Sequence, residues 1–260
     1  MKQKTLREDA HLREAEICRR RPHSVRECAL AHSFDRKVGK KMERIHVKVP
    51  GEQLQDREYM KQALALAEKG HGWVNPNPMV GAVLVKDGRI IGEGYHTRYG
   101  QLHAEREAFK NAAERGEETA GADLYVTLEP CCHTGKQPPC TEAVLASGVK
   151  RVIVGCTDPN PVVAGRGIRL LREKGLEVVA GVLRGECERQ NEVFFHFMRT
   201  KLPFTVLKYA MTLDGKTATV SGKSQWITGE AARKRVHEDR GRYMAILTGV
   251  STVLADNPQL

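Results

Sequence analysis

Three short segments of the chain carry residue types that together could hold a zinc ion and use it for hydrolysis. They are His103-Ala104-Glu105, Pro130-Cys131 and Pro139-Cys140. One imidazole and two thiolates suit Zn²⁺, which keeps a fourth tetrahedral position open for water in catalytic sites. We expect Glu105 to reach that water rather than the metal. A metal-bound water beside a carboxylate is the apparatus of hydrolytic deamination at an aromatic ring carbon.

Each segment alone has a simpler interpretation. His-Ala-Glu is common on solvated helices, and paired cysteines are often small buried hydrophobic residues. Cys132 and His133 are also rival ligands in the same loop. We expect Cys131 and Cys140 to bind the metal because each stands at a predicted helix start, where amide donors and the helix dipole favour a thiolate.

The roles of these residues follow from the chemistry. Zn²⁺ lowers the pKa of a bound water toward neutrality. Glu105 is predicted to take that proton and to pass protons to the ring nitrogen and to the departing amine. Glu105→Ala should therefore lose turnover but keep the metal, whereas His103→Ala or Cys131→Ala should lose the metal.

The composition is that of a soluble cytoplasmic protein. Aromatic residues make up 5% of the 260 residues, the mean hydropathy is −0.46, and no apolar run reaches membrane length. The seven cysteines are unevenly spaced and no secretory signal precedes them, so we expect a reducing compartment. Residues 1–50 carry +7 of the net charge of +10, which argues against a nucleic-acid partner for the folded body.

Residues 1–55 are predicted to be a basic, disordered N-terminal extension. They show no sustained apolar periodicity and contain runs such as Arg19-Arg20-Arg21 and Lys40-Lys41. Interspersed acidic residues argue against an organelle transit peptide. A misassigned start codon, with Met42 or Met60 as the true beginning, explains the segment equally well.

Residues 56–184 alternate between the signatures of strands and helices. Asp56 is a predicted N-cap for the first helix. The alternation predicts an α/β sandwich with helices on both faces, and it places the zinc ligands at strand-to-helix junctions. Strands are predicted at 80–85, 90–95, 124–128, 151–154 and 176–179, and helices at 56–66, 103–112, 141–146 and 168–174.

A second unit follows a predicted linker helix within residues 185–203. In residues 204–260 we expect strands at 204–210 and 245–248 and a helix at 229–241. Two strands and one helix cannot close a stable α/β core, so the sequence predicts an incomplete domain.

A resemblance to a known family rests on the zinc segments and on motifs around them. The chain resembles the bifunctional deaminase-reductase of riboflavin biosynthesis from about residue 57 onward, and its long cysteine loop is more specific than the generic deaminase signature. The resemblance implies a cytidine-deaminase-like three-layer α/β/α sandwich followed by an incomplete dihydrofolate-reductase-like α/β domain. The motifs are His103-Ala-Glu105, Thr127-Leu-Glu-Pro-Cys-Cys-His-Thr-Gly-Lys-Gln-Pro-Pro-Cys140, Asp158-Pro-Asn-Pro161, Gly165-Arg-Gly167 and Trp226-Ile-Thr228.

For the first domain the resemblance implies deamination of 2,5-diamino-6-(5-phosphoribosylamino)pyrimidin-4-one to 5-amino-6-(5-phosphoribosylamino)uracil. The resemblance implies that His103, Cys131 and Cys140 bind zinc and that Glu105 transfers protons. The phosphate tail of such a substrate favours contacts with Lys136 and a protonatable His133. Asn77 and Asp158 are equally well explained as turn or cap residues. The implied substrate contacts are Asn77, His96, His133, Lys136, Asp158 and Asn160.

For the second unit the resemblance implies reduction of the ribosyl group to ribityl by NADPH. Trp226 also suits simple core packing. The family's reductase continues well beyond Leu260 and often forms homo-oligomers, so reductase activity is not expected of this stretch alone. The implied cofactor contacts are Ala210, Trp226, Thr252 and Asp256, and the implied substrate contacts are Ser224 and Arg240.

Two alternatives to this prediction belong to different classes. A deaminase acting on cytosine, guanine or tRNA adenosine shares the zinc and the glutamate but would lack the reductase-like stretch after residue 200. A non-catalytic zinc-stabilised module would need a fourth protein ligand and would leave Glu105 without a role. The expected partner is a small molecule, with no nucleic acid and no membrane.

Overall fold

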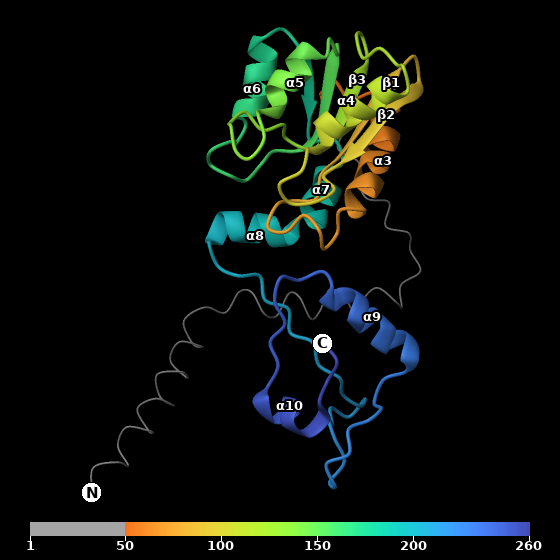
Figure 1. Ribbon diagram of the computed structural model, residues 1–260, viewed down its shortest axis with the longest axis vertical. Coiled ribbons are helices and arrows are strands. Elements are labelled where there is room, and N and C mark those ends of the chain that lie inside the picture. Colours follow the sequence, from red (N-terminus) through yellow and green to blue (C-terminus); the bar gives the residue numbers. More distant parts are fainter. Residues whose placement is uncertain (1–49) are drawn as a thin grey trace, which may run out of the picture. The chain divides into compact units, whose positions relative to one another are not determined.

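A five-stranded mixed sheet organises the computed structural model, which describes residues 50–260 (Figure 1). Its strand order is β2-β1-β3-β4-β5, with β1 antiparallel to both of its neighbours and β3, β4 and β5 parallel. The predicted extension falls almost wholly outside the described residues. The strands are β1 (Gly81–Lys86), β2 (Arg89–Tyr95), β3 (Asp123–Leu128), β4 (Arg151–Cys156) and β5 (Glu177–Ala180).

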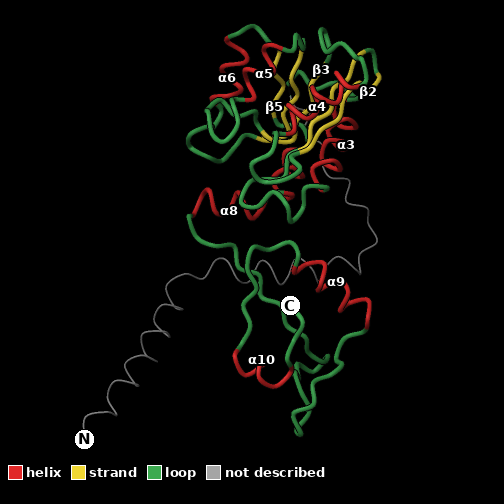
Figure 2. Tube along the Cα trace, viewed as in Figure 1, coloured by secondary structure: helices red, strands yellow, loops and turns green. Residues whose placement is uncertain are grey.

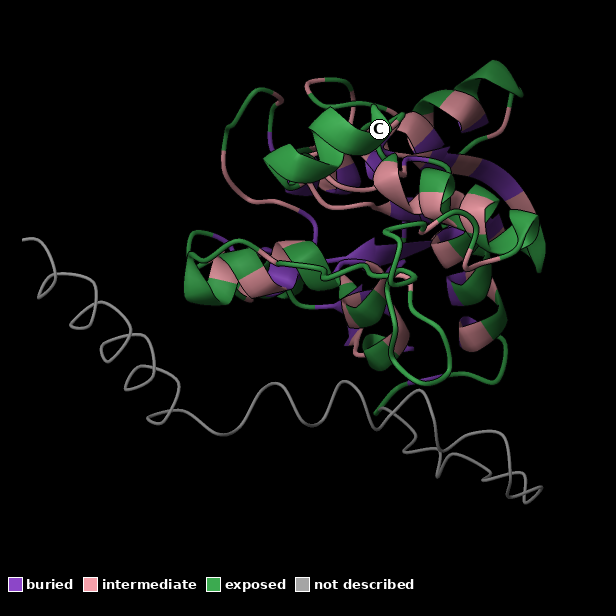
Figure 3. Ribbon diagram, turned by 90° about the horizontal axis from the view of Figure 1, so that it is seen from below, coloured by how far each residue is buried: buried purple, intermediate pink, exposed green. Residues whose placement is uncertain are grey.

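Helices cover both faces of this sheet, as predicted, and give the three-layer α/β/α sandwich. Two hydrophobic cores separate these layers. In the first core, α4, α5 and α6 pack against one face of the sheet, and in the second core, α3, α7 and α8 pack against the other face. The residues of β1, β3 and β4 are almost all buried, because helices cover both faces of these strands, and the strands are accordingly rich in apolar residues (Figure 3). The helices are α3 (Asp56–Glu68), α4 (Ala104–Glu114), α5 (Cys140–Ala146), α6 (Arg166–Glu173), α7 (Arg184–Gln190) and α8 (Glu192–Thr200).

Helix α4 lies directly on β2 because two glycines of β2 have no side chain. A Cβ atom at Gly94 would lie 2.3 Å from the Ala108 nitrogen, and one at Gly92 would lie 2.6 Å from the Ala108 oxygen. Small residues on the helix, Ala104, Ala108 and Ala112, complete this contact and are fully buried. The backbone of α4 therefore sits as close to the sheet as sterics allow.

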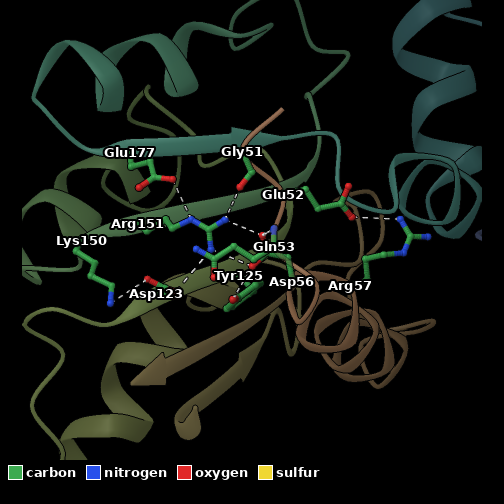
Figure 4. Close-up of polar contacts among 10 residues, drawn as sticks. All are labelled: Gly51, Glu52, Gln53, Asp56, Arg57, Asp123, Tyr125, Lys150, Arg151 and Glu177. Atoms are coloured by element: carbon green, nitrogen blue, oxygen red, sulfur yellow. Dashed lines mark hydrogen bonds and ion pairs between the residues drawn. The ribbon is translucent and has the colours of Figure 1, made fainter. Parts of the chain in front are cut away.

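A buried ion pair joins the start of α3 to the start of β4 (Figure 4). Arg151 donates to the Asp56 carboxylate at 2.9 and 2.6 Å and to the Gly51 carbonyl at 2.9 Å. The Tyr125 hydroxyl donates to the same carboxylate at 2.9 Å. Burial opposes ionisation of Asp56, but hydrogen bonds from Arg151, from the Gln53 amide and from Tyr125 outweigh it and lower the pKa of Asp56.

This pair corrects the prediction that Asp56 caps α3. The N-cap is Gln55, and Asp56 is the first residue of the helix, with a fully buried side chain. The carboxylate is used for a tertiary contact with an arginine 95 residues away, which an N-cap assignment from local sequence does not foresee.

The predicted linker segment contains two helices rather than one. Helix α7 ends at Gln190, and α8 begins after Asn191, whose side chain accepts from the Met79 amide and donates to the Met79 carbonyl, both at 2.8 Å. Phe195 of α8 is buried in the second core. The segment is therefore packed against the domain along much of its length.

Residues 203–260 do not contain the strands predicted at 204–210 and 245–248. The structure describes this whole stretch and finds α9 (Glu230–Arg240), as predicted, and α10 (Val250–Asp256), joined by loops (Figure 2). Leu207 and Leu247 are 81% and 99% exposed. A strand needs neighbours to pair with, and this stretch supplies no ladder that would bury its apolar residues. None of the helices in residues 50–260 has both the length and the apolar character needed to cross a membrane.

Candidate active site

The three predicted zinc ligands meet where β3 ends and two helices begin. His103 is the N-cap of α4, Cys140 is the first residue of α5, and Cys131 follows the end of β3. Their ligand atoms all lie within 4.8 Å of one another, with His103 Nδ1 3.3 Å from Cys140 Sγ and 3.6 Å from Cys131 Sγ. Donors around a tetrahedral Zn²⁺ are separated by about 3.3–3.8 Å, so this set fits the ion.

The electrostatics of the cluster favour a thiolate. The Cys140 thiol donates a hydrogen bond to Cys131 and, together with His103 and the Cys140 amide at 3.3 Å, holds the pKa of Cys131 well below its ordinary value. The same contact raises the pKa of Cys140. The hydrogen bond to Cys131 also raises the pKa of His103. A divalent cation would take the place of these protons, because zinc ligands bind deprotonated.

Glu105 lies in the first turn of α4 and is 3% exposed, yet it lines the cavity beside the ligands. Burial, and secondarily the negative charge of Cys131, raise the pKa of the Glu105 carboxyl. A carboxyl group with a raised pKa at this place is suited to hold and release a proton.

One cavity of about 260 Å³ gathers the predicted deaminase residues. Cys140 is the exception, because it is fully buried while it contacts the other two ligands. The predicted residues that line the cavity are Asn77, His96, His103, Glu105, Cys131, His133, Lys136, Asp158 and Asn160.

A histidine–asparagine pair forms one wall of this cavity. His96 is buried, its Nδ1 lies 2.9 Å from the Leu102 carbonyl, and its Nε2 lies 3.2 Å from Asn77 Nδ2. Burial lowers the pKa of His96, so the ring is neutral, with Nδ1–H donating to Leu102 and Nε2 accepting from Asn77. These bonds fix the amide plane of Asn77 at the cavity.

The loop between the two cysteines is held by neighbouring elements. Arg106 of α4 donates to the Pro139 carbonyl at 2.9 Å, just before Cys140. Lys136 Nζ lies 4.1 Å from the centre of the Tyr99 ring, a cation–π distance. Both Lys136 and Tyr99 line the cavity. The family resemblance predicts a role for Lys136 but not for Tyr99, which has no motif around it.

Glu129 is a buried residue beside the site that no local sequence pattern predicts. It directly precedes Pro130-Cys131, and its carboxylate accepts from the amides of Asp158 at 3.2 Å, Gly165 at 2.8 Å and Ile168 at 3.2 Å. The carboxylate thereby ties the zinc loop to the start of α6 and to the loop that carries Asp158. Burial raises the pKa of Asp158 to about 6.

No side-chain hydrogen bond, ion pair or ring contact within residues 50–260 joins two of the predicted reductase residues. Trp226 is 69% exposed and contacts Arg233, whose guanidinium lies 4.3 Å from the indole ring. Arg240 donates to the Gln259 carbonyl at 2.6 Å. Neither contact joins two members of the predicted set, which comprises Ala210, Ser224, Trp226, Arg240, Thr252 and Asp256.

Two family comparisons agree with this geometry. Residues 53–156 match the family described as the cytidine and deoxycytidylate deaminase zinc-binding region, and residues 203–260 match the RibD C-terminal domain. The first match contains the whole His103, Cys131 and Cys140 cluster. Fold and donor set together define a zinc-binding domain of the cytidine deaminase class.

Relatives that align over most of the chain narrow this class to one family. The riboflavin biosynthesis protein RibD of Actinobacillus pleuropneumoniae is 55% identical over 205 residues, which are 79% of this chain and 54% of that protein. RibD of Escherichia coli K12 is 50% identical over 80% of this chain and 56% of its own length. The chain belongs to the RibD family, and it spans about half the length of the curated relatives it matches.

A solved structure agrees with the family assignment. The diaminohydroxyphosphoribosylaminopyrimidine deaminase/5-amino-6-(5-phosphoribosylamino)uracil reductase of Thermotoga maritima matches with a TM-score of 0.76 at 53% identity. The match covers 79% of this chain and 58% of that chain.

Proposed function

We propose that the chain catalyses hydrolytic, zinc-dependent deamination of 2,5-diamino-6-(5-phosphoribosylamino)pyrimidin-4-one to the corresponding aminouracil in riboflavin biosynthesis. The observation that carries the proposal is the buried carboxyl of Glu105 in the same cavity as a three-residue zinc set. Three ligands leave a position for water, and the RibD relatives are named for this pathway.

His103, Cys131 and Cys140 would hold zinc, which when bound would supply a Lewis acid that makes water nucleophilic near neutral pH. Glu105 would take up the two protons of the attacking water in turn, giving the first to the ring nitrogen and the second to the leaving amine. The raised pKa of Glu105 supports this shuttle, because the carboxyl must be able to hold the proton between the two transfers.

The polar walls of the cavity support a substrate with amino and oxo groups and a phosphate tail. The neutral His96 orients Asn77, and His133 Nδ1 is buried with no hydrogen-bond partner among the described residues. Such a nitrogen is free to bond to a ligand. Lys136 supplies a positive charge for the phosphate, and Asp158 and Asn160 complete the polar set.

We propose that residues 204–260 are the first part of a reductase domain, connected through residues 185–203 to the deaminase domain at 56–184. The match of residues 203–260 to the RibD C-terminal domain supports this division. NADPH contacts at Ala210, Trp226, Thr252 and Asp256, and substrate contacts at Ser224 and Arg240, would require the rest of such a domain.

We also propose a reducing, cytoplasmic setting, a small-molecule substrate and a homo-oligomer formed through the reductase domain. The five cysteines within the described residues are free thiols, which supports the reducing setting. The cavity of about 260 Å³ supports a small molecule rather than a polymer.

The test is ammonia release by the purified, zinc-loaded chain from the phosphoribosylamino-pyrimidine, beside Glu105→Gln at equal zinc content. We expect release by the wild type and loss of at least 100-fold in the variant, the lower range for an acid–base residue. Cytidine, guanine and a tRNA adenosine stem-loop are the comparison substrates. Faster release from one of these would refute the proposed substrate and identify a different base.

A further inference from the structure

Helix α8 reaches the deaminase cavity although it lies outside both matched family regions. Those regions are residues 53–156 and 203–260, and α8 spans Glu192–Thr200 between them. Phe194 and Met198 nevertheless line the cavity that holds Glu105. The wall they form is therefore absent from the part of the chain that matches the general deaminase zinc-binding region.

The spacing of α8 residues explains this placement. Phe194 and Met198 are four residues apart, so they lie on one face of the helix. Phe195 is 4% exposed in the second core and anchors the helix to the domain, whereas Phe197 is 47% exposed. The helix thus has a cavity-facing pair, a buried anchor and an exposed phenylalanine that lines nothing in that cavity.

Asn191 holds α8 and another wall of the cavity in one place. Its buried side chain makes two 2.8 Å hydrogen bonds to the backbone of Met79. Met79 is two residues from Asn77, whose amide bonds to His96 in the cavity wall. A shift of Asn191 would therefore move both the apolar wall on α8 and the polar wall at Asn77.

We propose that α8 is part of the substrate site: Phe194 and Met198 contact the flat face of the substrate ring, and Asn191 is the positioning residue that aligns them with Asn77. The polar residues of the cavity suit ring edges and phosphate, and a ring face needs an apolar surface. Phenylalanine and the methionine sulfur both pack well against aromatic rings. The identity of the ring rests on the proposed function, but the wall itself does not.

The first experiment measures binding of the phosphoribosylamino-pyrimidine by calorimetry to the full, zinc-loaded chain in a Glu105→Gln background, where turnover is blocked. Phe194→Ala and Met198→Ala should each weaken binding about tenfold, since each removes a ring-facing apolar contact. Phe197→Ala removes the same atoms from an exposed place on the same helix, and it should change binding less than about twofold. Equal affinities in Phe194→Ala, Met198→Ala and Phe197→Ala would overturn the proposal.

The role of Asn191 needs a measurement that general destabilisation does not affect. If Asn191 acts through the α8 wall, adding Asn191→Ala to Phe194→Ala should weaken binding less than the two single effects combined. Additive losses of binding free energy would contradict a positioning role for Asn191. Melting temperatures of all variants show whether each remains folded under the conditions of the assay.

A second readout separates the wall from the proposed substrate. Zinc extraction by a chelator should be several-fold faster in Phe194→Ala and Met198→Ala than in Phe197→Ala, because the first two open the cavity that leads to the metal. If the wild type does not bind the pyrimidine but extraction still differs, the proposed function fails and the wall remains. Equal extraction rates in all three variants would refute the claim that Phe194 and Met198 form a wall of the cavity.

Discussion

Replacement of Glu129 by glutamine is the sharpest test of how the site is held together. One carboxylate oxygen accepts from the amides of Asp158 and Gly165, and the other accepts from the amide of Ile168 in the first turn of α6. A glutamine has one acceptor oxygen, so at least one of the three amides would face an NH₂ group. The negative charge at the helix N-terminus would be lost as well.

The expected cost can be worked from these contacts. An unsatisfied buried amide costs about 1–3 kcal/mol, so Glu129→Gln should lower the free energy of unfolding by about 2 kcal/mol. For a chain of this size the melting temperature should fall by about 4–8 °C. Glu129→Ala leaves all three amides without this acceptor and opens a cavity, so it should cost about 4 kcal/mol.

Urea unfolding of the zinc-loaded protein measures this cost, and steady-state deamination measures its effect on the site. Because Glu129 holds the loop that carries Asp158, we expect kcat/KM to fall by about tenfold in Glu129→Gln at unchanged zinc content. Glu142→Gln, on the exposed first turn of α5, is the matched control. If Glu129→Gln stays within about 0.5 kcal/mol of the control, the anchoring role is wrong.

Three further predictions concern the metal, the proton shuttle and the buried ion pair. Cys140→Ser should bind less than one equivalent of zinc after dialysis, measured by atomic emission, whereas Glu105→Gln should keep a full equivalent. Arg151→Met should cost about 3–5 kcal/mol in urea unfolding, because it strands the buried Asp56 carboxylate; a cost below about 1 kcal/mol would contradict this account. Since the folded-state pKa of Asp56 is lowered, its contribution is complete above its unfolded pKa of about 3.9 and is lost as pH falls through the lower folded value. The stability difference between wild type and Asp56→Asn should therefore be present at about pH 7 and shrink toward about pH 3, and a constant difference would argue against the pair.

Local sequence was sufficient to predict the strands of the sheet and the three residues, His103, Cys131 and Cys140, that the structure brings together. Strands β1, β3 and β4 are largely apolar runs between turn residues, and His103 and Cys140 lie where the helices α4 and α5 begin. Each of these sequence patterns spans only a few neighbouring residues, so it can be recognised without knowledge of tertiary contacts.

The missed features depend on contacts between distant segments. Asn191 bonds to a residue 112 positions away, and Arg151 bonds to Asp56 across 95 positions. The amphipathic pattern of α8 predicts a helix but not the cavity that Phe194 enters. The strand predicted at 204–210 failed for the same reason, because β-propensity becomes structure only when a neighbouring strand is present to pair with.

The glycines of β2 have a consequence for the metal chemistry. Gly92 and Gly94 set the distance of α4 from the sheet. The N-cap of α4 is His103, whose ring must meet two sulfurs carried by other segments. Metal–ligand bond lengths tolerate deviations of about 0.2 Å, far less than the displacement that one added methyl group would force on the helix. Zinc affinity is thus partly encoded on a strand that supplies none of the ligands, and Gly94→Ala is expected to appear as a metal-binding defect in a protein that keeps every donor.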